Sequence, residues 1–479
     1  MDDLSARALE TASIKGAQYA DIRVVHSKDE DISVKNGVVE SMSANETMGF
    51  GVRVLVDGAW GFASSREITN DEVDKVTDLA VKIARASALA PGERVKLGGP
   101  VASKGTYMTP VETDPFTISI EEKLNLLLEA DEAMAHVDGV KVRNSHLTFI
   151  KEHKTFANSE GADTDQTIYE AGGGIVSTAV GNEEVQRRSY PSIRAQGTGG
   201  WENILAMDLS GNGERIATES VQLLSAEQCP RDTMTTVILG SEQLALQIHE
   251  SCGHPIELDR VFGTEAAFAG TSFLTTEKLN NFQYGSEFVN ITAESFRPNG
   301  LGTFGWDDEG VPASSTPIVK NGKFVGYLMS RETASVLGLR SNGCMRASGW
   351  NRIPIIRMTN VSIEPGTWEL DDLIADTDDG IFMESNRSWS IDDKRYNFQF
   401  GTEIGYEIKN GKKGKMLRNC TYTGITPEFW NSCDAVCNEN NWVMWGTPNC
   451  GKGQPGQVAH TGHGAAPARF RNVKVGVMK

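Results

Sequence analysis

The sequence contains no long apolar run, and its N-terminus lacks the features of a secretory signal. No segment approaches the roughly 18 uninterrupted apolar residues that a membrane span needs. The chain begins Met1-Asp2-Asp3-Leu4, which is acidic where a secretory signal is basic and then apolar. We therefore expect a soluble, cytoplasmic protein with no membrane partner.

Basic residues are scarce relative to acidic ones. The chain has 46 lysine and arginine residues against 64 aspartate and glutamate residues, so its formal net charge is −18. An acidic chain repels phosphate backbones and lacks the basic surface of a nucleic-acid-binding protein. We expect no nucleic-acid partner, and the charge itself indicates only solubility.

Cysteine is also scarce, with seven residues in 479. This odd number, concentrated toward the C-terminus, favours free thiols or metal ligands over a disulfide framework. Cys420, Cys433, Cys437 and Cys450 could close a tetrahedral structural zinc site, although only their central Cys-x-x-x-Cys spacing fits such a site. Ordinary buried cysteines are the alternative interpretation.

The length and the patterning of the chain indicate two domains, because 479 residues exceed the size at which one core stops growing. We place the boundary near Cys229-Pro230, which gives domains at residues 1–229 and 230–479. The predicted class is α+β, with a helix-and-sheet N-terminal domain followed by a β-rich, barrel-like or sandwich-like C-terminal domain. Helices are predicted at residues 2–17, 70–89, 119–136 and 213–227, strands at 21–27, 51–56, 59–63 and after 139, and hairpin turns at Asn36-Gly37, Asp57-Gly58, Asn321-Gly322 and Asn410-Gly411.

The most informative stretch is a predicted strand that ends at Gly240, followed by a helix that leads into His249-Glu250-Ser-Cys-Gly-His254. Ser241 is expected to cap this helix, and Leu244 and Ile248 to face the core. Imidazole is a good zinc ligand, and a neighbouring carboxylate can take a proton from water. The pattern predicts His249 and His254 as metal ligands and Glu250 as general base, against the alternative that both histidines have no chemical role.

The spacing of the two histidines requires a particular backbone. They stand five residues apart, which places them about 140° apart on a regular helix. Gly253 permits a left-handed break and Pro255 biases His254 toward extended geometry, so His254 is expected beyond the helix end. A local π-bulge is the other solution.

A hydrolytic zinc needs about three protein ligands and one open position. Glu257, His460, His463 and several cysteines are available as the third ligand. The histidines of His460-x-x-His463 could instead support the ligands from behind or contact the reacting carbonyl. The glycine-rich surroundings of Cys450 fit either backbone close to a metal or a plain surface loop.

Asp307-Asp308-Glu309 is a run of three acids in a predicted turn. Carboxylates of this kind could bind a hard cation, but the surrounding turn residues favour a solvated turn.

Several motifs together resemble the TldD/PmbA family of metallopeptidase-like proteins. The resemblance implies zinc bound by His249, His254 and Cys450, with Glu250 as the catalytic base. It also implies a metal site in the β-rich C-terminal domain, and we expect one zinc per chain. The motifs are His249-Glu250-Ser-Cys-Gly-His254 with Glu257 and Asp259, Asp307-Asp308-Glu309-Gly310, Arg357-Met358-Thr359-Asn360, Cys450-Gly451-Lys452 and the segment from Gly462 to Asn472.

Proteins of this family act on peptides, and some work as a heterodimer with a PmbA-like subunit that lacks the histidine motif. Because this chain has the motif, it is similar to the catalytic member. We expect a zinc-dependent metallopeptidase that cleaves small or unfolded peptides, as a homodimer or with a PmbA-like subunit. The alternative is a non-catalytic peptide-binding or maturation partner of a related subunit, which holds an extended peptide at a sheet edge.

Overall fold

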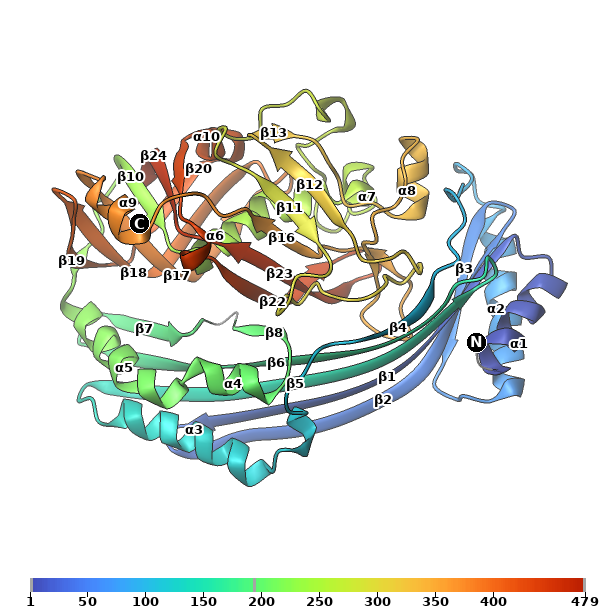
Figure 1. Cartoon of the computed structure of the whole chain (residues 1–479), viewed down its shortest axis with the longest axis horizontal. Coiled ribbons are helices and arrows are strands. Elements are labelled where there is room, and N and C mark those ends of the chain that lie inside the picture. The colour runs from blue at the N-terminus through green and yellow to red at the C-terminus, as the bar shows by residue number, and fades with distance from the viewer. Residues whose placement is uncertain (1–2, 193–194, 477–479) are drawn as a thin grey trace.

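Three large β-sheets organise the chain, whose computed structural model describes residues 3–192 and 195–476 (Figure 1). The first sheet and its helices come from the N-terminal part, and the other two sheets come from the C-terminal part. The predicted class, a helix-and-sheet part followed by a β-rich part, is therefore confirmed.

The N-terminal sheet has the strand order β3-β2-β1-β5-β6-β4, and β7 and β8 also pair with β6. Its pairs are antiparallel except β4 beside β6. Figure 1 shows β1, β2, β5 and β6 as a long curved arm. The elements are α1 (Asp3–Ile14), β1 (Tyr19–Lys35), β2 (Val38–Val56), β3 (Ala59–Ser65), α2 (Asn70–Ser87), β4 (Lys104–Met108), α3 (Ile120–Ala135), β5 (Val140–Asn158), β6 (Asp163–Val180), β7 (Val185–Tyr190), β8 (Gln196–Thr198), α4 (Trp201–Met207) and α5 (Leu209–Ser225).

Two groups of helices cover the ends of this arm. α1 and α2 pack on β1, β2 and β3 at one end, and α3, α4 and α5 pack on β1, β5 and β6 at the other. The four predicted helices of this part are confirmed as α1, α2, α3 and α5. None of the helices in the described residues is both long enough and apolar enough to cross a membrane.

The hairpin turns are confirmed, but the length of β1 is not. Asn36 and Asp57 adopt φ values of 50° and 51°, and each is followed by a glycine with positive φ, as tight hairpins require. The strand predicted at residues 21–27 continues to Lys35. Its polar second half remains a strand because it pairs with β2 on one side and β5 on the other, where Lys28 forms a cross-strand ion pair with Glu46.

The C-terminal part contains a barrel and a six-stranded sheet. β17, β10, β24, β20 and β18 are neighbours in that order, and β18 pairs back with β17, which closes a five-stranded barrel. The six-stranded sheet has the order β13-β12-β11-β16-β23-β22.

The division into domains at residue 229 stays a prediction. The elements are β9 (Glu227–Gln228), β10 (Thr233–Leu239), α6 (Ser241–Ile248), α7 (Leu258–Val261), β11 (Ile291–Glu294), β12 (Ser315–Lys320), β13 (Lys323–Phe324), α8 (Arg331–Val336), β14 (Met345–Arg346), β15 (Ile355–Ile356), β16 (Asn360–Ile363), α9 (Leu370–Ala375), β17 (Asp379–Ile391), β18 (Asn397–Lys409), β19 (Lys412–Arg418), β20 (Thr421–Ile425), α10 (Thr426–Asn431), β21 (Cys433–Val436), β22 (Val443–Lys452), β23 (Gln457–Ala465) and β24 (Ala468–Val475).

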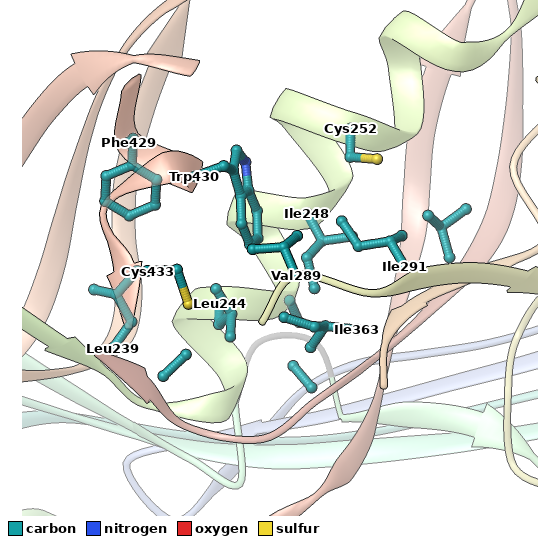
Figure 2. Packing of buried hydrophobic residues seen from close by; sticks show 14 of the residues in the cluster. Leu239, Leu244, Ile248, Cys252, Val289, Ile291, Ile363, Phe429, Trp430 and Cys433 are labelled. Atoms are coloured by element: carbon teal, nitrogen blue, oxygen red, sulfur yellow. The ribbon is translucent and has the colours of Figure 1, made fainter. Parts of the chain in front are cut away.

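Helix α6 lies between the barrel strand β17 and strands β16, β22 and β23 of the six-stranded sheet. Leu244 and Ile248 are fully buried in the core, as predicted, and Figure 2 shows them on the helix among residues of both sheets. The predicted cap is wrong. Gly240 occupies the capping position without a side-chain hydrogen bond, and Oγ of Ser241 accepts a hydrogen bond from Nε1 of Trp445 at 3.2 Å.

The acidic turn at residues 307–309 is buried against the N-terminal sheet, so the prediction of a solvated turn is wrong. Nη1 of Arg23 on β1 lies 3.3 Å from Oδ2 of Asp308, and Nη2 of Arg53 on β2 lies 3.3 Å from Oε1 of Glu309. Asp307 instead accepts backbone N–H groups within its own turn and from Met345. The turn resembles a solvent loop in sequence, but basic residues of β1 and β2 cover it and join the two parts of the chain.

Candidate metal centre

Three potential metal ligands from distant segments converge beside α6. His249 and His254 follow that helix, and Cys450 lies on β22. One donor atom from each of the three side chains lies within 4.8 Å of the others, and all three residues are buried. Two imidazoles and one thiol form a donor set that zinc accepts, with room for a fourth, exchangeable ligand. The residues present therefore fit a catalytic zinc.

The backbone brings the two histidines together through a π-turn. Residues His249–Gly253 form one turn of π-helix, and the N–H of His254 donates to the carbonyl oxygen of His249. In this geometry residues five apart lie over one another, so the two rings stand 4.9 Å apart between centroids. The expected left-handed break is wrong because Gly253 has a φ of −57°. The π-bulge, the other solution, is the one observed.

Gly253 is needed for space and not for backbone freedom. A Cβ atom at this position would lie 2.2 Å from Sδ of Met358, far inside van der Waals contact. The glycine therefore lets the π-turn pack directly against Met358, which follows β15.

His463 on β23 forms a hydrogen bond with the Nδ1 side of the His249 ring. Nδ1 of His463 lies 2.9 Å from the carbonyl oxygen of Val361, which can only accept a hydrogen bond. A neutral His463 therefore donates from Nδ1 and accepts at Nε2, where Nδ1 of His249 lies 2.7 Å away. This chain of hydrogen bonds leaves Nε2 of His249 as the nitrogen suited to a metal.

Glu257 gives His254 the corresponding support. Its Oε2 lies 3.1 Å from Nδ1 of His254, so Nδ1 carries the proton and donates it to Glu257. Nε2 of that ring is then the nitrogen whose lone pair is available to a metal. Nε2 of His254 lies 3.6 Å from Sγ of Cys450. This separation matches the edge of about 3.6 Å expected for a nitrogen and a sulfur on one tetrahedral zinc. Nζ of Lys452 lies 3.4 Å from Glu257 and 2.7 Å from Asp259, which balances the buried negative charge.

The protonation states of the cluster suit metal binding at the histidines. Burial, reinforced by the positive charge of Arg395 and other cations, holds the pKa of His254 well below its usual value, so the ring is neutral. Burial raises the pKa of Cys450 to about 11, against a lowering effect of Arg357. In the absence of a metal Cys450 is therefore a protonated thiol, and it must release its proton when it becomes a ligand.

Glu250 lies close enough to this cluster for its charge to raise the pKa of Cys450, and it contacts a residue that the sequence did not indicate. Nη1 of Arg395, from the turn between β17 and β18, donates to Oε2 of Glu250. The turn reads Asp392-Asp393-Lys394-Arg395, which by itself predicts only an exposed charged loop. No sequence signal connects Arg395 with Glu250, because their proximity depends on the closed barrel.

Other predicted residues lie elsewhere. His460 points to the N-terminal sheet, where its Nδ1 lies 2.6 Å from Oε2 of Glu170, and it borders a cavity of about 270 Å³ between the two parts. In the described residues Cys420, Cys433 and Cys437 are separate buried thiols, and they form no metal-binding group with Cys450. Burial raises the pKa of Cys433 and Cys437 to about 12, so these are ordinary core cysteines.

Comparison with known protein families gives matches along most of the chain. Residues 20–84 match domain 1 of the PmbA/TldA metallopeptidases, residues 113–226 match their central domain, and residues 232–477 match their C-terminal domain. The last match contains His249, His254 and Cys450.

Curated proteins and solved structures agree with these matches. A metalloprotease of Methanocaldococcus jannaschii is 29% identical over 94% of this chain and 95% of its own length. A zinc metalloprotease TldD homolog of Saccharolobus solfataricus is 22% identical over 98% of both chains. The crystal structure of TldE from Thermococcus kodakarensis shares the fold, with a TM-score of 0.73 at 18% identity over 98% of this chain and 99% of that one. The chain thus belongs to the PmbA/TldD metallopeptidase family.

Proposed function

We propose that the chain is a zinc-dependent peptidase that hydrolyses peptide bonds in small or unfolded peptides. His249, His254 and Cys450 hold one zinc per chain, and Glu250 is the general base. The observation that carries the proposal is the convergence of these three ligands near the carboxylate of Glu250, which directly follows the first of them and whose charge acts on Cys450. Relatives named metalloproteases, one of them a zinc metalloprotease, support it.

The roles of the protein groups follow from their positions. When bound, zinc supplies Lewis-acid activation of a water molecule and of the scissile carbonyl. Glu250 accepts a proton from the attacking water and returns it to the leaving nitrogen. Glu257 and His463 hold the two ligand imidazoles in the tautomer that directs Nε2 toward the metal. His460 contacts none of these groups, and its place beside the cavity of about 270 Å³ suits contact with a substrate.

The proposed assembly is a dimer, with a second copy or with a PmbA-like subunit. Strand β3 pairs with β2 only from Phe50 to Val56. In the described residues the outer edge of β2 from residue 38 to residue 48 therefore has no strand partner, and Val38 and Met42 are 67% and 54% exposed. An open strand edge with apolar side chains is a surface to which another polypeptide can add. The cytoplasmic location stays a prediction.

Replacement of the proposed base tests the function. Zinc-loaded Glu250→Gln should keep one zinc per chain, measured by elemental analysis, and lose peptide hydrolysis by a factor of about 10² or more. Chelation should abolish hydrolysis by the unchanged protein, and added zinc should restore it. An active Glu250→Gln variant would contradict the mechanism. Peptide binding that persists without metal and without cleavage would favour the non-catalytic partner.

A further inference from the structure

The turn that carries Arg395 is fixed on several sides. It occupies residues 392–396, between β17 and β18. Three successive carbonyl oxygens of the turn accept hydrogen bonds from other segments: that of Asp393 from Nη2 of Arg260 at 2.8 Å, that of Lys394 from the N–H of Phe273 at 3.0 Å, and that of Arg395 from Oγ1 of Thr426 at 2.9 Å. The turn is therefore a rigid support and not a free loop.

The backbone of Arg395 is held in a conformation that its side chain does not favour. Its φ is 64°, in the left-handed region that side chains with a Cβ rarely adopt. Such strain persists only when the surrounding contacts impose it, and it gathers at functional sites. In this conformation the Arg395 side chain is only 15% exposed, and its guanidinium donates to Glu250.

The guanidinium has one donor engaged and another available. Nη1 donates to Oε2 of Glu250. Nη2 has no hydrogen-bond acceptor among the described residues and, unlike Nε, is not among the fully buried atoms.

We propose that Arg395 is a catalytic residue that binds the carbonyl oxygen of the scissile peptide bond and stabilises the negative charge formed on it. This inference rests on the proposed peptidase function. The water oxygen bonds to the carbonyl carbon, its proton passes to Glu250, and the C=O π pair moves to the carbonyl oxygen. That charge receives the hydrogen bond from Arg395. The electron pair on that oxygen then re-forms the C=O bond, the carbon–nitrogen bond breaks with its pair on the nitrogen, and the leaving nitrogen takes the proton from Glu250.

Arginine suits this role because its donors are arranged in a planar fork. Nη1 can remain on Glu250 while Nη2, the other terminal nitrogen of the same planar group, donates to a substrate oxygen, which aligns the base and the reacting carbonyl through one rigid group. A lysine at this position keeps the charge but has a single nitrogen and cannot occupy both places.

A buried ion pair fixes the surrounding loops relative to the turn. Arg260 is fully buried, and its Nη1 lies 2.9 Å from Oε2 of Glu265. Oε1 of Glu265 in turn accepts the N–H of Gly453, three residues beyond Cys450. The turn of Arg395 and the segment of Cys450 are thus tied to the same ion pair. A guanidinium fixed in this way needs little rearrangement when charge develops on the substrate.

Kinetics of three zinc-loaded variants test the proposal. The substrate is the peptide that the unchanged protein hydrolyses fastest in a tryptic digest of casein. Arg395→Gln should lower kcat by about 10²–10³, with little change in KM or zinc content. Arg395→Lys should recover part of the loss. The matched control is Lys394→Gln, which removes the same charge from an exposed side chain of the same turn and should keep the original kcat.

Binding of two analogues of this peptide separates contact with the substrate from indirect effects. A phosphinic analogue places a charged oxygen where the carbonyl oxygen reacts, and a reduced-amide analogue has no oxygen there. Calorimetry should show that Arg395→Gln lowers the affinity for the phosphinic analogue by about the same factor of 10²–10³. The affinity for the reduced-amide analogue should be nearly unchanged. Thermal unfolding checks that each variant is folded. If Arg395→Gln does not fold, the same ratio is measured for Arg395→Lys, where a smaller selective loss is expected.

Four results would overturn the inference. A kcat for Arg395→Gln equal to that of the unchanged protein would remove the role altogether. If Arg395→Gln lowers the affinity for both analogues equally, Arg395 supports Glu250 and does not contact the substrate. The same conclusion follows if kcat falls while neither affinity changes. A zinc-loaded, unchanged protein that hydrolyses no casein peptide would overturn the proposed function and this inference together, and only that outcome affects both.

Discussion

Nε2 of His254 lies 3.6 Å from Sγ of Cys450, although 196 residues separate the two in the chain. The two atoms approach at the distance expected of two zinc ligands, and without a metal they form at most a weak hydrogen bond. The imidazole of His254 is held by Glu257 at its other nitrogen. The backbone of Cys450 is held by Arg357, which donates to the carbonyl oxygen of that residue. The site is therefore preorganised for an ion.

Replacing Cys450 should remove the metal, because a serine hydroxyl is a far weaker zinc ligand than a thiolate. Cys450→Ser is expected to contain less than about a tenth of the zinc of the unchanged protein after dialysis. Cys433→Ser, which changes another buried thiol, is the control and should keep full occupancy. Elemental analysis gives the ratio. Loss of zinc from both variants would restore the four-cysteine cluster as an explanation.

Replacing His463 should weaken zinc binding without removing a ligand. In His463→Phe the ring keeps its size, but Nδ1 of His249 loses its acceptor. Loss of such a supporting hydrogen bond lowers metal affinity by about 10–100-fold. Competition with a fluorescent chelator measures the change. An unchanged affinity would show that His249 orients itself without this partner.

Gly253→Ala should destabilise the fold, because the added methyl group would overlap Sδ of Met358. Overpacking of this kind costs about 1–3 kcal/mol in the free energy of unfolding. Gly456→Ala is the matched control, since nothing lies within 4 Å of a Cβ at that position. Urea unfolding of both metal-free variants gives the difference. Equal stability of the two would mean that the π-turn shifts to accept the methyl group.

Asp308→Asn should destabilise the contact between the N-terminal sheet and the C-terminal part. Asp308 is buried, and Arg23 and Lys154 both lie against its carboxylate. Removing one charge from a buried group of this kind costs about 3–5 kcal/mol. Asp379→Asn, which breaks the exposed pair with Lys409, should cost at most about 1 kcal/mol. Similar losses in the two variants would show that the buried charges contribute no more than surface charges.

The ion pair between His460 and Glu170 should stabilise the fold more at low pH. Burial lowers the pKa of His460, but the adjacent Glu170 carboxylate outweighs it and leaves the pKa raised. A raised pKa means that this stabilisation is complete below the unfolded-state value of about 6.5 and is lost as the pH rises through the folded-state value. A double-mutant cycle with His460→Gln and Glu170→Gln should therefore give a larger coupling energy at pH 5.5 than at pH 8.5. A coupling energy independent of pH would contradict the charged pair.

Local patterns predicted the helices, the hairpin turns and the histidine motif, because each depends on residues close together in the chain. The conformation of the backbone between His249 and His254 could not be predicted from the local sequence alone. Gly253 and Pro255 are compatible with a helix end and with a π-turn, and the outcome depends on packing against Met358, about a hundred residues away. Cys450 was identified through family resemblance and not through spacing.

The residues that escaped prediction act across the fold. Arg395 reaches Glu250 because β17 and β18 are part of a closed barrel that surrounds one side of α6. By sequence alone the acids at 307–309 resemble a solvated turn, because their partners, Arg23 and Arg53, lie more than 250 residues earlier in the chain. Ion pairs of this range leave no periodic signal in a sequence.

The closure of the barrel also sets an order of events during synthesis. Strand β10 leads directly into α6, yet one of its barrel neighbours is β24, which the ribosome makes much later. Until β24 emerges, the strand that supports the histidine helix has an open edge, and Cys450 has only recently been added. The N-terminal arm can fold first as a unit, but a nascent chain should have no assembled zinc site. Protein synthesis itself would thus delay assembly of the proposed zinc site until β24 has been made.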